Sequence, residues 1–220
     1  RLAVSTAAPL TRAVAEGFFR RFGKPLVQGL GIIEIGLPLL NTGGASDAPT
    51  AVGRPLPAFD VELRDEEGIP VAVGRVGELW IKGPGMFDAY LSPWQPVAEI
   101  CVNGWFPTGD LAETDAAGRV FIRGRKKSVL NVNGMKVFPE EVEAIIELHP
   151  AVRRCRVIGI EHMVLGTVPA AEVILKSDAR LDSRELISWC RKSLSAFKVP
   201  VKVSFVDSLE LTASGKVKRG

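Results

Sequence analysis

Apolar residues recur at helical spacing near the start of the chain. Over residues 10–22 this spacing predicts an amphipathic helix, which ends at the break formed by Gly23, Lys24 and Pro25. Short strands are predicted on either side of the helix, over residues 1–5 and 25–30. The apolar positions of the helix are Val14, Phe18, Phe19 and Phe22. Residues 1–47 are therefore expected to run as strand, helix, strand and loop, which is typical of an α/β fold.

The pattern changes between residues 48 and 122. Short stretches of alternating apolar and polar residues, such as 59–63 and 77–81, are separated by turns rich in Gly, Pro and Asp. Alternation with a period of two predicts strands that are buried on one face. This part is expected to form a small antiparallel β-barrel or sheet.

A third pattern follows residue 128. Residues 129–138 are expected to form a hairpin, and Pro139 opens a predicted helix over 139–147, since proline suits the first helical turn. The remaining predicted elements are strands at 152–160, 170–175 and 203–206 and a helix at 184–194. We therefore predict two domains, over residues 1–123 and 129–220, joined by a hinge at 124–128, the second of them a small α+β domain.

Composition indicates a soluble globular protein. Of the 220 residues, 46% are hydrophobic and 24% charged, no apolar run could cross a bilayer, and the first residues lack a signal-peptide pattern. Three widely spaced cysteines fit neither a zinc site nor a disulfide framework, which favours a reducing cytoplasm. The chain begins at Arg1, already in a predicted strand, so we expect a fragment of a longer protein.

The net charge of +3 is concentrated at residues 123–127 and near the end of the chain. A nucleic-acid-binding protein would show a longer basic stripe interleaved with aromatic residues, and the chain has one tyrosine. Small polyphosphate ligands fit the two clusters better, although a solvated basic surface is the alternative.

Lys216 closes the stretch Leu211-Thr212-Ala213-Ser214-Gly215-Lys216. A lysine on a short loop of this kind is a mobile point charge with three donors, suited to reaching an anionic centre. Upstream, Asp110 closes the stretch Gly104-Trp105-Phe106-Pro107-Thr108-Gly109-Asp110 and follows its Thr108-Gly109 turn. A carboxylate placed there can accept hydrogen bonds from two adjacent hydroxyls, as in a ribose, although a bare turn aspartate commonly bonds its own backbone.

These two stretches, with Gly124-Arg125-Lys126-Lys127 between them, resemble motifs of the adenylate-forming enzymes: acyl-CoA synthetases, luciferases and peptide-synthetase adenylation domains. The longest match, residues 131–143, looks like the acyl-CoA synthetase version of this region. A match at residues 195–200 resembles the family's Y-K-[VI]-P. The resemblance covers nearly the whole chain and implies the end of a large AMP-binding domain followed by a small mobile domain.

The resemblance implies a role for each matching residue. Asp110, with Thr108 beside it, would bind the ribose of ATP, and Arg125 would share the ribose or phosphate contact. Lys216 would bridge the carboxylate substrate and the α-phosphate, and Lys127 would be the hinge about which the small domain rotates. Gly134 would let the backbone approach a thiol-bearing arm closely, because it has no side chain.

Two stretches depart from the family pattern. Residues 5–10 match the adenine-pocket segment S-G-G-A-P-L, with both glycines replaced and Ala8 retained. Residues 30–34 match Y-G-x-T-E, with Gly31 and Glu34 retained but Leu30 and Ile33 in place of the aromatic and the threonine. Glu34 remains a Mg²⁺ ligand candidate. Loss of the threonine hydroxyl would cost roughly 1.5–3 kcal/mol of phosphate binding, so weak ATP use is expected.

Glu141 and Glu143 are acid/base candidates in isolation, but we interpret both as helix-start acids favoured by the macrodipole.

The implied activity is that of an acid–thiol ligase. A carboxylic acid, such as a fatty acid, and ATP would give acyl-adenylate and pyrophosphate, and coenzyme A would then displace AMP. Two alternatives stay open: loading of an acyl carrier protein, and a non-catalytic homologue that has lost ATP use. The family's phosphate loop and acyl pocket lie upstream of this chain, so the fragment alone is expected to be inactive.

Overall fold

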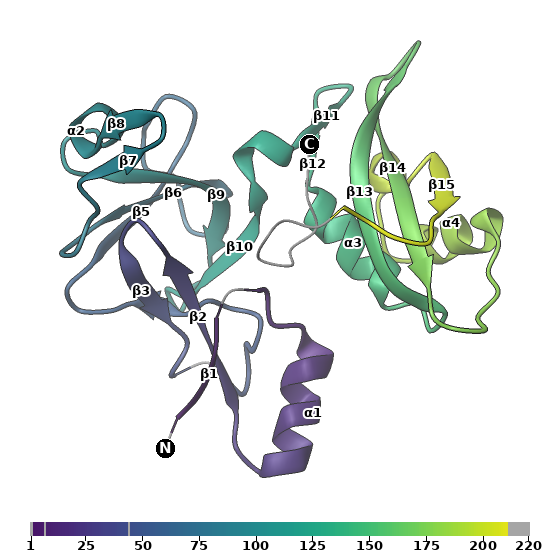
Figure 1. The fold of residues 1–220 in the computed structure, drawn as a ribbon, viewed down its shortest axis with the longest axis horizontal. Helices are drawn as coiled ribbons and strands as arrows, with labels where there is room; N and C mark the ends of the chain where they lie inside the picture. Colours follow the sequence, from purple (N-terminus) through teal and green to yellow (C-terminus); the bar gives the residue numbers. More distant parts are fainter. Residues whose placement is uncertain (1, 7, 44, 211–220) are drawn as a thin grey trace. The chain divides into compact units, whose positions relative to one another are not determined.

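The computed structural model describes residues 2–6, 8–43 and 45–210 (Figure 1). The chain divides into two compact units, Arg1–Arg123 and Gly124–Gly220.

The first unit begins with a strand–helix–strand unit. Strand β1 (Ala3–Ser5) runs parallel to β2 (Leu26–Ile32), and helix α1 (Arg12–Phe22) connects them. Thr11 caps the start of the helix, where its hydroxyl accepts the Val14 N–H at 3.3 Å, and Gly23 ends the helix with a left-handed φ of 65°. The expected α/β arrangement is confirmed.

Two further strands complete this sheet. They are β3 (Gly36–Leu40) and β4 (Arg54–Pro55), and the sheet order is β1-β2-β3-β4.

A second, antiparallel sheet occupies the rest of the first unit. It contains β5 (Asp60–Arg64), β6 (Gly77–Lys82), β9 (Phe106–Thr114) and β10 (Val120–Arg125), in the order β10-β9-β6-β5. Between β6 and β9 lie the hairpin strands β7 (Ala89–Leu91) and β8 (Trp94–Pro96) and the short helix α2 (Val97–Ile100).

The expected β-structure is therefore present, as an open sheet. Within the part of the chain that the structure describes, the strand pairings do not close into a ring, because β5 and β10 are the two edges. An isolated bridge between Gly53 and Val120 attaches β10 to the segment before β4. Both sheets contribute to one core, with Ile35, Leu39, Leu79 and Ile81 at most 2% exposed.

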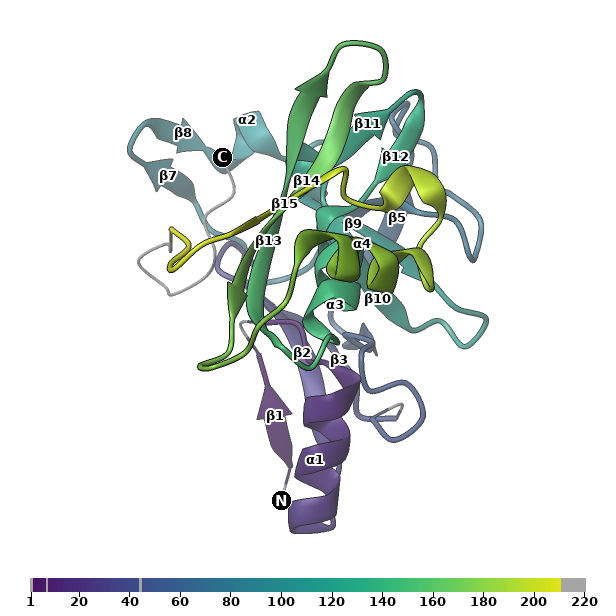
Figure 2. The ribbon, with the colours of Figure 1, turned by 90° about the vertical axis from the view of Figure 1, so that its right-hand side faces the viewer.

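The second unit is an α+β domain, as expected. Strands β11 (Leu130–Val132), β12 (Met135–Val137), β13 (Val152–His162) and β14 (Gly166–Leu175) form a sheet in the order β12-β11-β14-β13, and β15 (Lys202–Phe205) runs parallel to β14. Helices α3 (Pro139–Glu147) and α4 (Ser183–Arg191) contact each other and pack on this sheet (Figure 2). Short 3-10 turns occupy Lys126–Ser128 and Ala196–Lys198.

Across the described residues, no helix is long and apolar enough to span a bilayer. Cys101, Cys155 and Cys190 are free thiols.

Candidate functional site

Asp110 lies in a bulge of strand β9. Trp80 of β6 pairs with Pro107 and Glu78 pairs with Leu111, so residues 108–110 together face the single residue Leu79. Gly109 sits at the centre of the bulge with a φ of 71°, a left-handed conformation that favours glycine. The bulge is what redirects the strand at the Thr-Gly-Asp sequence.

The Thr108 hydroxyl holds this bulge together. Its Oγ1 donates to the Leu79 carbonyl at 2.9 Å and accepts the Asp110 N–H at 3.1 Å. Both Thr108 and Asp110 are buried, Asp110 to 6% exposure. Because the hydroxyl is engaged with backbone on both sides, Thr108 fixes the position of Asp110.

Trp105, which lies in the turn before β9, stacks against Arg64, a residue that the sequence analysis did not single out. The Arg64 guanidinium lies 4.9 Å from the Trp105 ring centroid and 4.6 Å from that of Trp80. Its Nε also donates to Glu62 at 2.7 Å. A cation between two indole rings anchors the turn that precedes β9, and no local sequence signal connects Arg64 with a motif some forty residues later.

Glu34 lies in the turn between β2 and β3, and its Oε1 accepts a hydrogen bond from the Tyr90 hydroxyl at 2.7 Å. Loss of hydration, together with donation to Glu34, raises the pKa of Tyr90 to about 12. The Phe87 ring lies 4.8 Å from Tyr90 and 5.8 Å from Phe106. A continuous chain of contacts therefore links Glu34 to the strand that carries Asp110.

Glu34 also suits a magnesium ion held mainly by a nucleotide. Among the described residues, no group of three or more His, Cys, Asp or Glu side chains could hold a metal by itself. Mg²⁺ typically takes one or two protein carboxylates and completes its shell with phosphate oxygens and water. Glu34 retains a second carboxylate oxygen, Oε2, outside its bond to Tyr90, so the residues present fit this mode of binding.

Ala8 and Gly31 are both exposed and lie beyond the paired residues of the parallel strands β1 and β2. A Cβ built on Gly31 would meet no atom closer than the Gly36 carbonyl at 4.0 Å. The Ile33 side chain is 96% exposed. This edge of the sheet therefore has room for a ligand, and carboxyl ends of parallel strands are the usual ligand-binding edge in α/β folds.

In the second unit, Gly134 forms a tight turn between β11 and β12. Asn133 and Gly134 have φ values of 48° and 81°, the left-handed pair of a two-residue hairpin turn. The Gly134 N–H donates to Asn131 Oδ1 at 2.9 Å. The φ of Gly134 favours glycine, and a Cβ there would meet no atom within 4 Å, so the outer surface of the turn is open.

At the start of the second unit, the charged residues are exposed and Gly124 is buried. Arg125 and Lys127 are exposed, the first at the end of β10 and the second in the 3-10 turn. Gly124 is buried, and a Cβ there would lie 2.5 Å from Glu140 Oε2. A side chain at position 124 would therefore displace the Glu140 carboxylate of helix α3.

The interpretation of Glu143 as a helix-start acid is wrong. Glu143 is 8% exposed, its Oε1 accepts the Val157 N–H of β13 at 2.8 Å, and burial raises its pKa to about 7. Glu141, in the first turn of α3, is instead exposed and forms an ion pair with Lys198 at 2.7 Å. Only Glu141 fits the expected pattern, because α3 turns Glu143 towards the sheet.

Glu143 predicts a pH dependence of local stability. Its pKa of about 7 in the folded protein lies above the ordinary glutamate value of 4.5, so the folded state binds the proton more tightly. Protonated Glu143 therefore stabilises the folded state. This contribution to the free energy of unfolding is complete below about pH 4.5 and is lost as pH rises through 7, a change of roughly 3 kcal/mol. Hydrogen exchange of amides in 139–162 should therefore show less protection at pH 8 than at pH 5, after correction for intrinsic exchange. Glu143→Gln should remove this difference, and an unchanged difference in the variant would refute the assignment.

Lys216 falls outside the residues that the structure describes.

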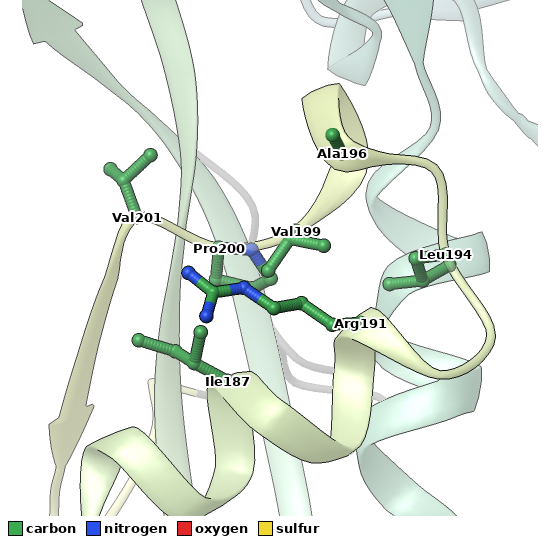
Figure 3. Close-up of a pocket in the computed structure, with 7 residues that line it drawn as sticks. All are labelled: Ile187, Arg191, Leu194, Ala196, Val199, Pro200 and Val201. Atoms are coloured by element: carbon green, nitrogen blue, oxygen red, sulfur yellow. The ribbon is translucent and has the colours of Figure 1, made fainter.

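The second unit contains a hollow of about 470 Å³ beside helix α4 (Figure 3). Its lining is Ile187, Arg191, Leu194, Ala196, Val199, Pro200 and Val201. None of the candidate residues that the structure describes lines this hollow.

Comparison with known proteins gives the family. Residues 1–91 match the family described as AMP-binding enzyme, and residues 141–216 match the AMP-binding enzyme C-terminal domain. A long-chain-fatty-acid–CoA ligase of Yersinia pestis is 37% identical over 222 residues, covering 100% of this chain and 39% of the relative. A feruloyl-CoA synthase of Amycolatopsis is 34% identical, covering 97% of this chain and 44% of the relative.

Solved structures with a similar fold point to the same family. The ATP-bound MatB structure from Rhodopseudomonas palustris superposes with a TM-score of 0.89 at 32% identity, covering 99% of this chain and 44% of that one. The anthranilate CoA ligase AuaEII, in complex with anthranoyl-AMP, superposes with a TM-score of 0.86 at 29% identity, covering 99% and 43%. The chain thus spans about two fifths of the length of these proteins. Together, the two family matches and these relatives show that the chain belongs to the adenylate-forming AMP-binding enzymes.

Proposed function

We propose that the protein containing this chain is an ATP-dependent acid–thiol ligase. It would activate a carboxylic acid as acyl-adenylate and transfer the acyl group to coenzyme A. The observation that carries the proposal is the bulge at residues 108–110, which holds Asp110 in place and is joined through Phe106, Phe87 and Tyr90 to Glu34. These contacts support a shared nucleotide site, with a hydroxyl-binding carboxylate and a cation-binding carboxylate on one scaffold.

Within this proposal each candidate has a distinct task. Asp110 accepts hydrogen bonds from the ribose hydroxyls, and Thr108 is a positioning residue for it. Glu34 binds Mg²⁺, whose charge offsets the phosphates. Arg125 and Lys216 supply positive charge to the nucleotide and to the acid as the α-phosphate rearranges. Ala8 and Gly31 leave room beside the adenine.

The second half-reaction would use the second unit. Gly134 offers an open turn to the thiol-bearing arm of coenzyme A, and Lys127 would be the point about which the unit rotates between half-reactions. The exposure of Lys127 supports this, because a hinge residue must change φ and ψ without losing buried contacts.

Product analysis tests the proposed function. The full-length protein would be incubated with ATP, Mg²⁺, coenzyme A and a panel of aliphatic and aromatic acids, since the relatives named above include fatty-acid and feruloyl enzymes. The proposal predicts AMP, pyrophosphate and an acyl-CoA thioester for at least one acid. A thioester found only on an added carrier protein would favour the carrier-loading alternative, and no AMP with any acid would favour a non-catalytic homologue.

Ile33 makes a separate prediction about ATP affinity. Its exposed aliphatic side chain stands where the family has a threonine, so one hydroxyl donor to phosphate is missing. Ile33→Thr should tighten binding of ATP with Mg²⁺ by about tenfold, the effect of one charge-assisted hydrogen bond. Calorimetry on the full-length protein measures this directly, with Ile33→Val as the control that adds no hydroxyl. Equal gains in both variants would contradict the missing-donor explanation.

A further inference from the structure

Glu34 is held at two points by a segment far along the chain. The Tyr90 hydroxyl donates to Glu34 Oε1 at 2.7 Å, and the Phe87 N–H donates to the Glu34 carbonyl at 2.9 Å. The Phe87 and Tyr90 rings also contact each other, with their centroids 4.8 Å apart. Both the main chain and the carboxylate of Glu34 are therefore fixed by residues 87–90.

The negative charge of Glu34 is oriented but not neutralised by this contact. Within the part of the chain that the structure describes, no lysine or arginine forms an ion pair with Glu34, and its side-chain partner is the uncharged Tyr90 hydroxyl. Carboxylates that bind metal ions are commonly oriented by a hydrogen bond from a neighbouring residue in this way. The arrangement therefore suits a cation brought by a ligand.

The Tyr90 hydroxyl treats the two carboxylate oxygens of Glu34 differently. It donates to Oε1 and leaves Oε2 outside the hydrogen bond. Mg²⁺ demands a small, near-ideal octahedral shell, which a single carboxylate oxygen fits, whereas Ca²⁺ takes a larger and more flexible shell and accepts carboxylates through both oxygens. A hydrogen bond that occupies Oε1 therefore favours the smaller ion.

We propose that Tyr90 is a positioning residue that makes the nucleotide site selective for Mg²⁺ over Ca²⁺, because it holds Oε1 of Glu34 and leaves Oε2 for the cation. The inference rests on the proposed function, in which Glu34 binds the cation that accompanies the nucleotide. Tyr90 lies outside every motif that the sequence analysis identified, and only its contact with Glu34 connects it with the site.

Binding of a non-hydrolysable nucleotide tests the proposal without catalysis. Calorimetry would measure the affinity of the full-length protein for α,β-methylene-ATP, once with MgCl₂ and once with CaCl₂. Tyr90→Phe keeps the ring that contacts Phe87 and removes the hydroxyl. The affinity with Mg²⁺ should fall about tenfold, a usual effect of losing a hydrogen bond to a metal ligand. The affinity with Ca²⁺ should stay within about twofold, because the freed Oε1 becomes available to the larger ion.

Two further variants control this experiment. Trp94→Phe removes an aromatic N–H donor from the same hairpin, where Trp94 is 69% exposed, and should leave both affinities within about twofold of wild type. In a Glu34→Gln background, Tyr90→Phe should have no further effect on the preference for Mg²⁺, because the two residues act as one unit.

The outcomes separate this inference from the proposed function. An equal fall with both cations in Tyr90→Phe would overturn the role of Tyr90, because a loss of local structure does not discriminate between ions. An unchanged affinity with Mg²⁺, or wild-type nucleotide binding that needs no metal ion, would also overturn it. A protein that loses its preference for Mg²⁺ in Tyr90→Phe, but whose wild type forms no acyl-CoA with any acid, would refute the ligase function and leave the role of Tyr90 standing.

Discussion

Replacing Lys216 by alanine should reduce acid-dependent exchange of pyrophosphate into ATP by roughly 100- to 1,000-fold in the full-length protein, the usual effect of removing one preorganised charged donor from a transition state. In the proposed function, Lys216 closes the sequence Thr212-Ala213-Ser214-Gly215-Lys216 and its ammonium would bridge the carboxylate and the α-phosphate. Negative charge shifts between these groups only while the adenylate forms. Thioester formation from supplied acyl-adenylate should therefore change much less.

The matched control for Lys216 is Lys218→Ala, two residues further along the same stretch. It removes the same charge from the chain and should leave pyrophosphate exchange close to wild type. If Lys216→Ala lowers both half-reactions equally, or if Lys218→Ala lowers exchange as much, the catalytic role proposed for Lys216 is wrong.

The second large effect is expected at the proposed hinge. Proline at position 127 fixes φ near −65° and restricts Lys126 as well, so the second unit should be held in one orientation. One half-reaction should remain near wild type and the other should fall roughly 100-fold, since small errors in placement have effects of this size. Single-turnover assays of each half-reaction measure the split, and Lys127→Ala controls for loss of the charge.

Proteolysis gives an independent test of the same hinge. Arg125 and Lys127 are exposed residues at the start of the second unit, so trypsin should cut there first and leave a compact C-terminal piece. First cleavage inside residues 152–175 would contradict a hinge at this place, as would equal impairment of both half-reactions by Lys127→Pro.

The sequence predicted helices and turns well where the residues that determine an element are adjacent in the chain. Helix α3 begins at Pro139 and ends at Glu147, as the proline and the apolar period predict. The hairpin around Asn133 and Gly134 follows from a dipeptide that accepts left-handed φ at both positions. In both cases the residues that determine the structure lie within the element itself or next to it.

Contacts between distant residues were not predictable in this way. Tyr90 donates to Glu34 across 56 positions of sequence, and Arg64 stacks on Trp80 and Trp105 from two other segments. Glu143 was misinterpreted because its burial depends on β13, fourteen residues later, where it accepts the Val157 N–H. The bulge at Asp110 likewise depends on the register between β9 and β6, which the Thr-Gly-Asp sequence alone does not specify.

The most direct test of adenylate formation is isotope exchange with the full-length wild-type protein. Labelled pyrophosphate should enter ATP only when Mg²⁺ and a suitable carboxylic acid are both present, and Asp110→Ala should weaken ATP binding and reduce this exchange. The Asp110 effect is expected because the bulge holds its carboxylate in the proposed ribose site. Acid-independent exchange, or undiminished exchange in Asp110→Ala, would contradict the account.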